Sequence, residues 1–118
     1  MASYRLTNSP SGGQSEVLET LHYQGAIRGG VPLYRFGTMV SNRYHGSDTR
    51  MGSDPQWEAD VKTVLGALQT AGYVTGHDVN GANVDLTGSP AGTTFIVLTG
   101  AGRAQARHPN PNPRTAPY

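Results

Sequence analysis

A single amphipathic helix, expected between residues 54 and 72, constrains the fold of this chain more than any other segment. Asp54 can accept hydrogen bonds from the free N–H groups of a first turn, and Pro55 suits the first helical position. The apolar residues that follow recur with the period of one helical face: Trp57, Val61, Val64, Leu65 and Leu68. Gly72 is placed to end the helix in a left-handed conformation. The pattern predicts a helix that buries one face in a core.

A β-hairpin is expected soon after this helix. Residues 84–87 alternate in polarity and residues 93–99 are rich in β-branched side chains, so both ranges predict strands. Residues 88–92, with the sequence Gly-Ser-Pro-Ala-Gly, have the composition of a hairpin loop. The Asn80-Gly81 step is a second turn signal ahead of the first strand. A helix followed by a hairpin indicates the α+β class.

The first half of the chain has weaker patterns. Ser15 can cap a short helix that stops at Gly25. Residues 33–40 fit either a strand, by alternation, or a short helix with Leu33, Phe36, Met39 and Val40 inward. Alternation favours the strand, although periodicity does not settle so short a run. Residues 41–53 are polar and predict a loop.

Length and composition indicate one small domain. The chain has 118 residues, of which 14% are charged, with 16 glycines and 8 prolines, so we expect a modest core and many turns. We expect an extended arm over residues 1–13 and a proline-rich, extended tail over residues 105–118. Between them, over residues 14–104, amphipathic helices should pack on a short antiparallel β-hairpin.

Several chemistries lack the residues they need. The absence of cysteine excludes disulfides and thiolate metal sites, and the four histidines do not have the paired spacing of a zinc site. Residues 96–105 resemble a dinucleotide-binding glycine loop only in part, because Gln105 stands at the third glycine position. No Gly-x-Ser-x-Gly motif of an activated serine is present. We therefore expect a non-enzymatic protein without a cofactor or a metal.

The sequence also bears on location. No apolar run approaches the ~20 residues that cross a membrane. The first ten residues hold no apolar segment of the signal-peptide type. We expect a cytoplasmic protein or, alternatively, one carried in a virion.

Three segments resemble, in the same order, parts of winged-helix DNA-binding domains of the MarR and PadR kind. Residues 17–21 (Val-Leu-Glu-Thr-Leu) resemble that family's first helix, and residues 65–74 (Leu-Gly-Ala-Leu-Gln-Thr-Ala-Gly-Tyr-Val) the end of a later helix. Residues 98–104 (Leu-Thr-Gly-Ala-Gly-Arg-Ala) resemble the close of the wing. The resemblance covers less than half of the chain. It implies a small regulator that binds duplex DNA, often as a homodimer because operators are two-fold symmetric.

The resemblance also implies where cations meet DNA. It places Arg43, Arg50 and Lys62 near the DNA backbone and Arg103 beside the wing. Two features depart from the family pattern. The start of the predicted helix at residue 54 carries three acidic residues, which phosphates would repel: Asp54, Glu58 and Asp60. The segment before that helix is long and loop-like, where the family has a compact second helix.

A structural component of a larger assembly, such as a phage head, neck or tail, is the alternative function. The chain is low in charge and rich in Gly, Ser, Thr, Asn and Pro, with an arm and a tail at its ends. Such arms can add a strand to a neighbour's sheet. In this interpretation tyrosines form the contact surfaces, since tyrosine is enriched at interfaces. The candidates are Tyr4, Tyr23, Tyr34, Tyr44 and Tyr118.

Overall fold

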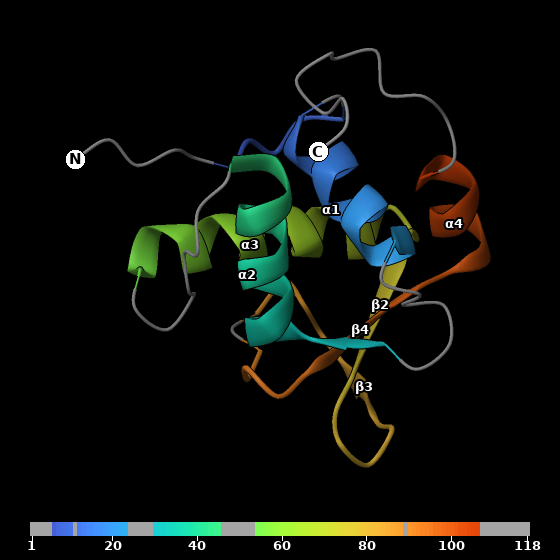
Figure 1. Cartoon of the computed structure of the whole chain (residues 1–118). Helices are drawn as coiled ribbons and strands as arrows, with labels where there is room; N and C mark the ends of the chain where they lie inside the picture. The colour runs from blue at the N-terminus through green and yellow to red at the C-terminus, as the bar shows by residue number, and fades with distance from the viewer. Residues whose placement is uncertain (1–5, 11, 24–29, 46–53, 89, 107–118) are drawn as a thin grey trace.

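The chain folds into helices packed with one small antiparallel sheet in the computed structural model (Figure 1). The structure describes residues 6–10, 12–23, 30–45, 54–88 and 90–106. The elements, in chain order, are α1 (Gly13–Tyr23), β1 (Val31–Pro32), α2 (Leu33–His45), α3 (Pro55–Thr70), β2 (Val74–His77), β3 (Asn83–Val84), β4 (Phe95–Leu98) and α4 (Gly100–Ala106). The prediction of a single α+β domain is confirmed.

Helix α3 is confirmed close to its predicted ends. The Asp54 carboxylate accepts hydrogen bonds from the backbone N–H groups of Gln56 and Trp57, both at 3.1 Å, and Pro55 is the first helical residue. Gly72 takes a φ of +86° just beyond the helix, a conformation that favours glycine. The predicted apolar stripe is the buried face of the helix: Trp57, Val61, Val64, Leu65 and Leu68.

Residues 33–40, which fitted either a strand or a short helix, are helical, and the inward residues are those expected for the helix: Leu33, Phe36, Met39 and Val40. The preference for a strand from alternation was wrong. Helix α2 also continues to His45, into the predicted loop, while the adjoining strand β1 is limited to Val31–Pro32. Two distant carbonyl groups accept from the first turn: Leu33 N–H donates to the Thr94 oxygen at 2.8 Å, and Tyr34 N–H donates to the Gly92 oxygen at 3.2 Å. These contacts satisfy N–H groups that no local side chain caps, which is why the start of the helix lacked a capping signal in the sequence.

The strands pair differently from the predicted hairpin. The sheet order is β1-β4-β2-β3, with β2 antiparallel to both β3 and β4, so the expected pairing of residues 84–87 with residues 93–99 was wrong. The hairpin instead joins β2 to β3 through the Asn80-Gly81 turn, where Gly81 has a φ of +85°. The chain leaves β3 because Thr87 donates both its N–H and its hydroxyl to the Asp85 carboxylate, forming a local turn.

One hydrophobic core lies between the helices and the sheet. It includes Leu6, which is only 5% exposed, so the domain extends into the predicted arm of residues 1–13. The predicted tail begins within α4, and residues 107–118 lie outside the described residues. Within the part of the chain that the structure describes, no helix is long and apolar enough to span a bilayer.

Candidate nucleic-acid interface

Three of the four predicted DNA-contacting cations lie in the described ranges, each on a different helix. Arg43 lies near the end of α2, half-buried, and Lys62 lies in the middle of α3. Arg103 is exposed on α4, which packs against α1 and β4. Arg50 is outside the described residues. Figure 1 shows α4 and the start of α3 at opposite sides of the molecule.

Arg103 is not beside a wing, and that prediction was wrong. Strand β4 begins opposite His77, near the β2–β3 turn, and ends at Leu98 opposite Val74, so α4 starts at the far end of the strand from that turn. Thr99 Oγ1 accepts a hydrogen bond from Gly102 N–H at 2.9 Å, which caps α4. The segment that resembled the close of a wing is therefore a strand end followed by a capped helix.

The three acidic residues at the start of α3 each have a structural role. Asp54 caps the helix, and Glu58 accepts from the Lys62 ammonium at 2.8 Å. The Asp60 side chain is buried, with 7% exposure of the residue, and accepts from the Leu6 N–H and the Gln56 side-chain amide, both at 3.1 Å. Their charges are thus held by caps, an ion pair and hydrogen bonds, which weakens the expected repulsion of phosphates.

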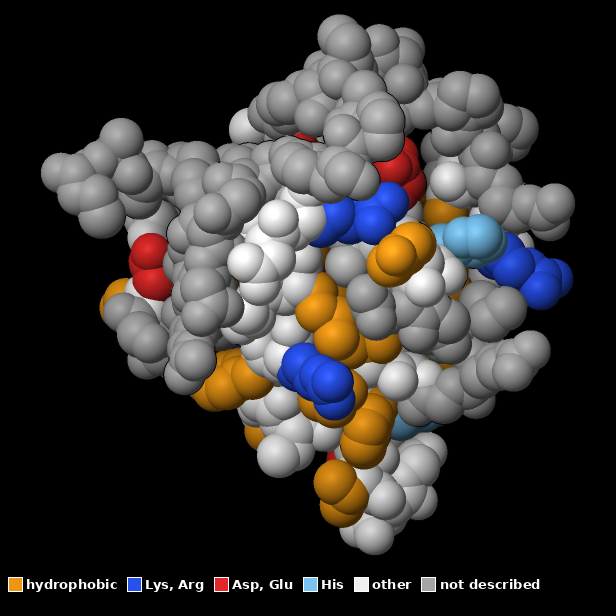
Figure 2. All heavy atoms as spheres, viewed as in Figure 1, with side chains coloured by type: hydrophobic (Ala, Val, Ile, Leu, Met, Phe, Trp, Pro, Cys, Tyr) orange, Lys and Arg blue, Asp and Glu red, His pale blue; other side chains and the backbone are white. Residues whose placement is uncertain are grey.

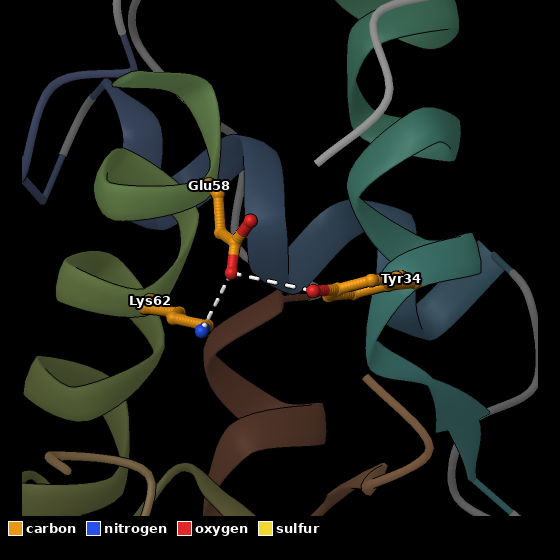
Figure 3. A network of polar contacts seen from close by, with 3 residues as sticks. All are labelled: Tyr34, Glu58 and Lys62. Atoms are coloured by element: carbon orange, nitrogen blue, oxygen red, sulfur yellow. Dashed lines mark hydrogen bonds and ion pairs between the residues drawn. The ribbon is translucent and has the colours of Figure 1, made fainter. Parts of the chain in front are cut away.

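Glu58 also connects α3 to α2. The Tyr34 hydroxyl, on the first turn of α2, donates to the same Glu58 oxygen that Lys62 contacts, at 3.4 Å (Figure 3). The Tyr34 ring lies over Gly92, where an added Cβ would come within 2.8 Å of three ring atoms. The network holds one side of α3 against α2 and leaves the other side of α3 to solvent.

That solvent side of α3 is uncharged. Four residues on it are exposed: Gln56, Ala59, Thr63 and Thr70. We call these four residues the polar face of α3. Amide and hydroxyl groups can donate to and accept from base edges, and they can donate to phosphate oxygens.

Two hollows adjoin the polar face of α3. The first, of about 550 Å³, lies between residues 6–8 and the first half of α3. The second, of about 320 Å³, lies between the second half of α3 and Thr87-Gly88. Thr63 lines both hollows, so they adjoin each other along the helix. The chain segments at residues 6–8 and 87–88 therefore flank the polar face.

Charge is unevenly divided along the chain. Four of the nine basic residues and seven of the eight acidic residues lie in the described ranges, so this part of the chain carries net negative charge. Between Lys62 and Arg103 the sequence contains no Lys or Arg, so the loops around β3 offer no cation to a phosphate. The other five basic residues lie outside the described ranges.

The predicted interface tyrosines are only partly placed. Tyr23 is 70% exposed at the end of α1, with the Arg43 guanidinium 4.4 Å from its ring centroid, and Tyr34 is 43% exposed. Basic and hydrophobic side chains lie interspersed on the face shown in Figure 2. Tyr4, Tyr118 and the side chain of Tyr44 lie outside the described set. Among the residues described, no group of three or more His, Asp or Glu residues is arranged to hold a metal ion.

The comparisons with known proteins add no relative. No protein-family model, curated protein sequence or solved structure matches the chain.

Sequence reasoning missed the packing of residues 6–8 beside α3. Leu6 falls in a segment that composition assigns to an arm, and Asp60 falls where acidic residues usually complement a helix dipole. The position of Asp60 near the buried stripe of α3, three residues after Trp57 and one before Val61, was the one available signal.

Proposed function

We propose that this protein binds duplex DNA through the polar face of α3, as a small non-enzymatic DNA-binding protein with a winged-helix-like domain. The observation that carries the proposal is the order of elements around that face. A first helix, a compact second helix (α2) and the candidate recognition helix (α3) are followed by the β2–β3 hairpin. This order supports the proposal, because the resemblance implies a compact second helix ahead of the recognition helix.

The chemistry of the polar face supports the same proposal. In helix-turn-helix proteins the second helix of the pair enters the major groove and presents side chains near its N-terminus to base edges. Gln56 is exposed in the first turn of α3 and Thr63 near its middle, and an amide or hydroxyl side chain can pair with base edges there. The neighbouring carboxylates of Glu58 and Asp60 already have partners within the fold.

The cations divide into two groups under this proposal. Lys62 flanks the polar face and is a candidate for a phosphate contact, although such a contact has to compete with Glu58. Arg43 is a weaker candidate because its guanidinium lies over Tyr23. Arg103 is assigned no contact, because α4 lies on another side of the molecule.

A pair of matched variants tests the proposed face. Thr63→Glu places one negative charge on the polar face of α3, and Gln105→Glu places the same charge on an exposed position of α4. In fluorescence anisotropy with mixed duplex DNA, we expect Thr63→Glu to weaken binding at least tenfold at about 0.1 M salt, because it repels phosphates. Gln105→Glu should change binding less than twofold. Equal effects of the two substitutions would refute the assignment of the face.

An assembly protein, such as a virion component, remains the second candidate, favoured by Tyr23. A tyrosine that is 70% exposed, with an arginine over its ring, has the chemistry enriched at protein interfaces. Light scattering after size exclusion separates the candidates. A monomer or dimer that binds DNA supports the first, and large particles that disperse on Tyr23→Ser substitution support the second.

A further inference from the structure

Gln56 is a member of the polar face of α3 whose side-chain amide is held in one orientation. Its Nε2 donates to Asp60 Oδ1 at 3.1 Å, four residues further along the helix. Both Asp60 oxygens accept hydrogen bonds here, so the Gln56 amide has to turn its nitrogen, and not its oxygen, towards Asp60. This contact determines which end of the amide faces the fold.

Asp60 is itself fixed by a buried contact. The residue is 7% exposed, and its other oxygen, Oδ2, accepts from the Leu6 backbone N–H at 3.1 Å. Leu6 belongs to the hydrophobic core, and the next residue is tied to α1, where Thr7 Oγ1 accepts from Gly13 N–H at 3.2 Å. A carboxylate that is held through Oδ2 gives the Gln56 amide a fixed partner.

The rest of the Gln56 amide is available to a ligand. Gln56 is exposed and lines the larger hollow, and within the described ranges its second Nε2–H and its Oε1 have no hydrogen-bond partner. Gln69 on the same helix is different, because it donates to the Val84 oxygen at 2.9 Å and accepts from Leu86 N–H at 2.7 Å. Gln69 uses both ends of its amide inside the fold, whereas Gln56 keeps one donor and one acceptor side by side.

An adjacent donor and acceptor match one particular base in the major groove. Adenine presents N7 as an acceptor beside its N6 amino donor, whereas guanine presents two acceptors, N7 and O6. The Gln56 amide can therefore make two hydrogen bonds to adenine while its nitrogen stays on Asp60. Against guanine its oxygen would face O6, and turning the amide over would break the contact with Asp60.

We propose that Gln56 recognises an adenine in the major groove and that Asp60 is the positioning residue that makes Gln56 discriminate against guanine. In this contact Gln56 Nε2 donates to adenine N7, and Oε1 accepts from the N6 amino group. Recognition of adenine rests on the proposed function, because it names a base that the polar face of α3 contacts. Asp60 does not touch DNA and acts only through the orientation of the Gln56 amide.

A comparison of selected binding sites tests the role of Gln56. Wild type, Gln56→Ala and Gln105→Ala each enrich bound duplexes from a pool with a randomised centre. Both substitutions remove an exposed amide, the first from α3 and the second from α4. We expect wild type and Gln105→Ala to enrich A·T at one position that Gln56→Ala leaves random. Replacing that A·T pair by G·C should weaken wild-type binding about tenfold and Gln56→Ala binding less than about twofold, by fluorescence anisotropy.

Asp60→Asn tests the positioning role with the same two duplexes. An asparagine can offer either a donor or an acceptor to Gln56, so the Gln56 amide becomes free to turn over and donate to guanine. The preference for A·T over G·C should fall from about tenfold to under about threefold at this position alone. The change in net charge acts on both duplexes equally and cancels in the ratio. A loosened fold would instead relax the preference at every enriched position.

The outcomes are separable. Wild-type binding without an A·T position that depends on Gln56 overturns the recognition of adenine and leaves the proposed function standing. An Asp60→Asn protein that keeps the full preference, or loses preference at all positions alike, overturns the positioning role of Asp60. Absence of wild-type binding to the starting pool at about 50 mM salt overturns the proposed function and the recognition of adenine together.

Discussion

Helices α2 and α3 are in contact, yet their sequences specify them in different ways. Helix α3 carries its own start, stripe and stop: the Asp54 cap, the apolar period and Gly72. Helix α2 starts directly after a strand, and the carbonyl groups that accept from its first turn belong to Thr94 and Gly92, some sixty residues further along the chain. A helix defined by local signals can be predicted from its segment, whereas a helix completed by distant groups cannot.

The largest effect is expected from substitutions that remove the contact between the two helices. Trp57 on α3 is 2% exposed, and its indole N–H donates to the Gly37 carbonyl of α2 at 3.1 Å. Trp57→Ala should lower the free energy of unfolding by about 3–5 kcal/mol through loss of packing. Trp57→Phe keeps an aromatic ring and loses the hydrogen bond, so it should cost about 1–2 kcal/mol. Urea unfolding followed by far-UV circular dichroism measures both, and equal costs would contradict the packing argument.

The next test weakens α2 from a distance. Gly92→Ala places a Cβ about 2.7 Å from atoms of the Tyr34 ring, so the ring has to shift and lengthen its bond to Glu58. We expect a loss of about 1–3 kcal/mol in unfolding free energy, measured in urea by tryptophan fluorescence. Gly88→Ala is the control, because its nearest atom is the Asp85 oxygen at 3.8 Å. A control as costly as Gly92→Ala would show that loop substitutions destabilise without acting through α2.

A smaller effect is expected at the local start of α3. Asp54→Ala removes the acceptor for two backbone N–H groups and should cost about 1 kcal/mol, while Asp54→Ser keeps a cap and should cost less. The helical signal should persist at low urea, because the buried stripe of α3 is intact. If Asp54→Ala unfolded the protein, α3 would depend on its cap more than on its packing.

The smallest expected effect is on the pH dependence of stability. Hydrogen bonds from the Thr87 hydroxyl and then from its backbone N–H lower the pKa of Asp85 in the folded state. Its ionised form therefore adds stability above about pH 4, and this contribution is lost as the pH falls through the lowered pKa. The advantage of wild type over Thr87→Val in urea midpoint should be present at pH 6 and shrink towards pH 2. A constant difference across that range would exclude the Asp85 contact as its source.

The parts of the fold that sequence predicted are those with local signals. The ends of α3 and the Asn80-Gly81 turn follow from caps, period and glycine. The strand pairing could not be predicted from local signals, because the position of residues 85–88 depends on a long-range contact. Gln69 of α3 donates its amide to the Val84 oxygen at 2.9 Å and accepts from Leu86 N–H at 2.7 Å. These bonds tie the chain after β3 to a helix, away from β4.

The candidate site likewise combines a feature that local sequence signals predict with features that long-range contacts determine. The position of Lys62 near the polar face could be read from the helical period of α3. The hydrogen-bonded state of the two carboxylates could not, since the partners of Asp60 and Glu58 include Leu6 and Tyr34, which lie far away in sequence. Arg103 was misplaced because a Leu-Thr-Gly string fits a strand end and a helix cap equally well.

The salt dependence of wild-type binding to duplex DNA tests the central claim most directly. Log affinity against log salt, from about 50 to 200 mM, should fall with a slope of roughly −0.9 for each phosphate that a cation contacts. A slope of about −1 or steeper, with the protein a monomer or dimer by light scattering, is the predicted result. No binding at about 50 mM salt, where phosphate contacts are least screened, would contradict the assignment of α3 as a DNA-binding surface.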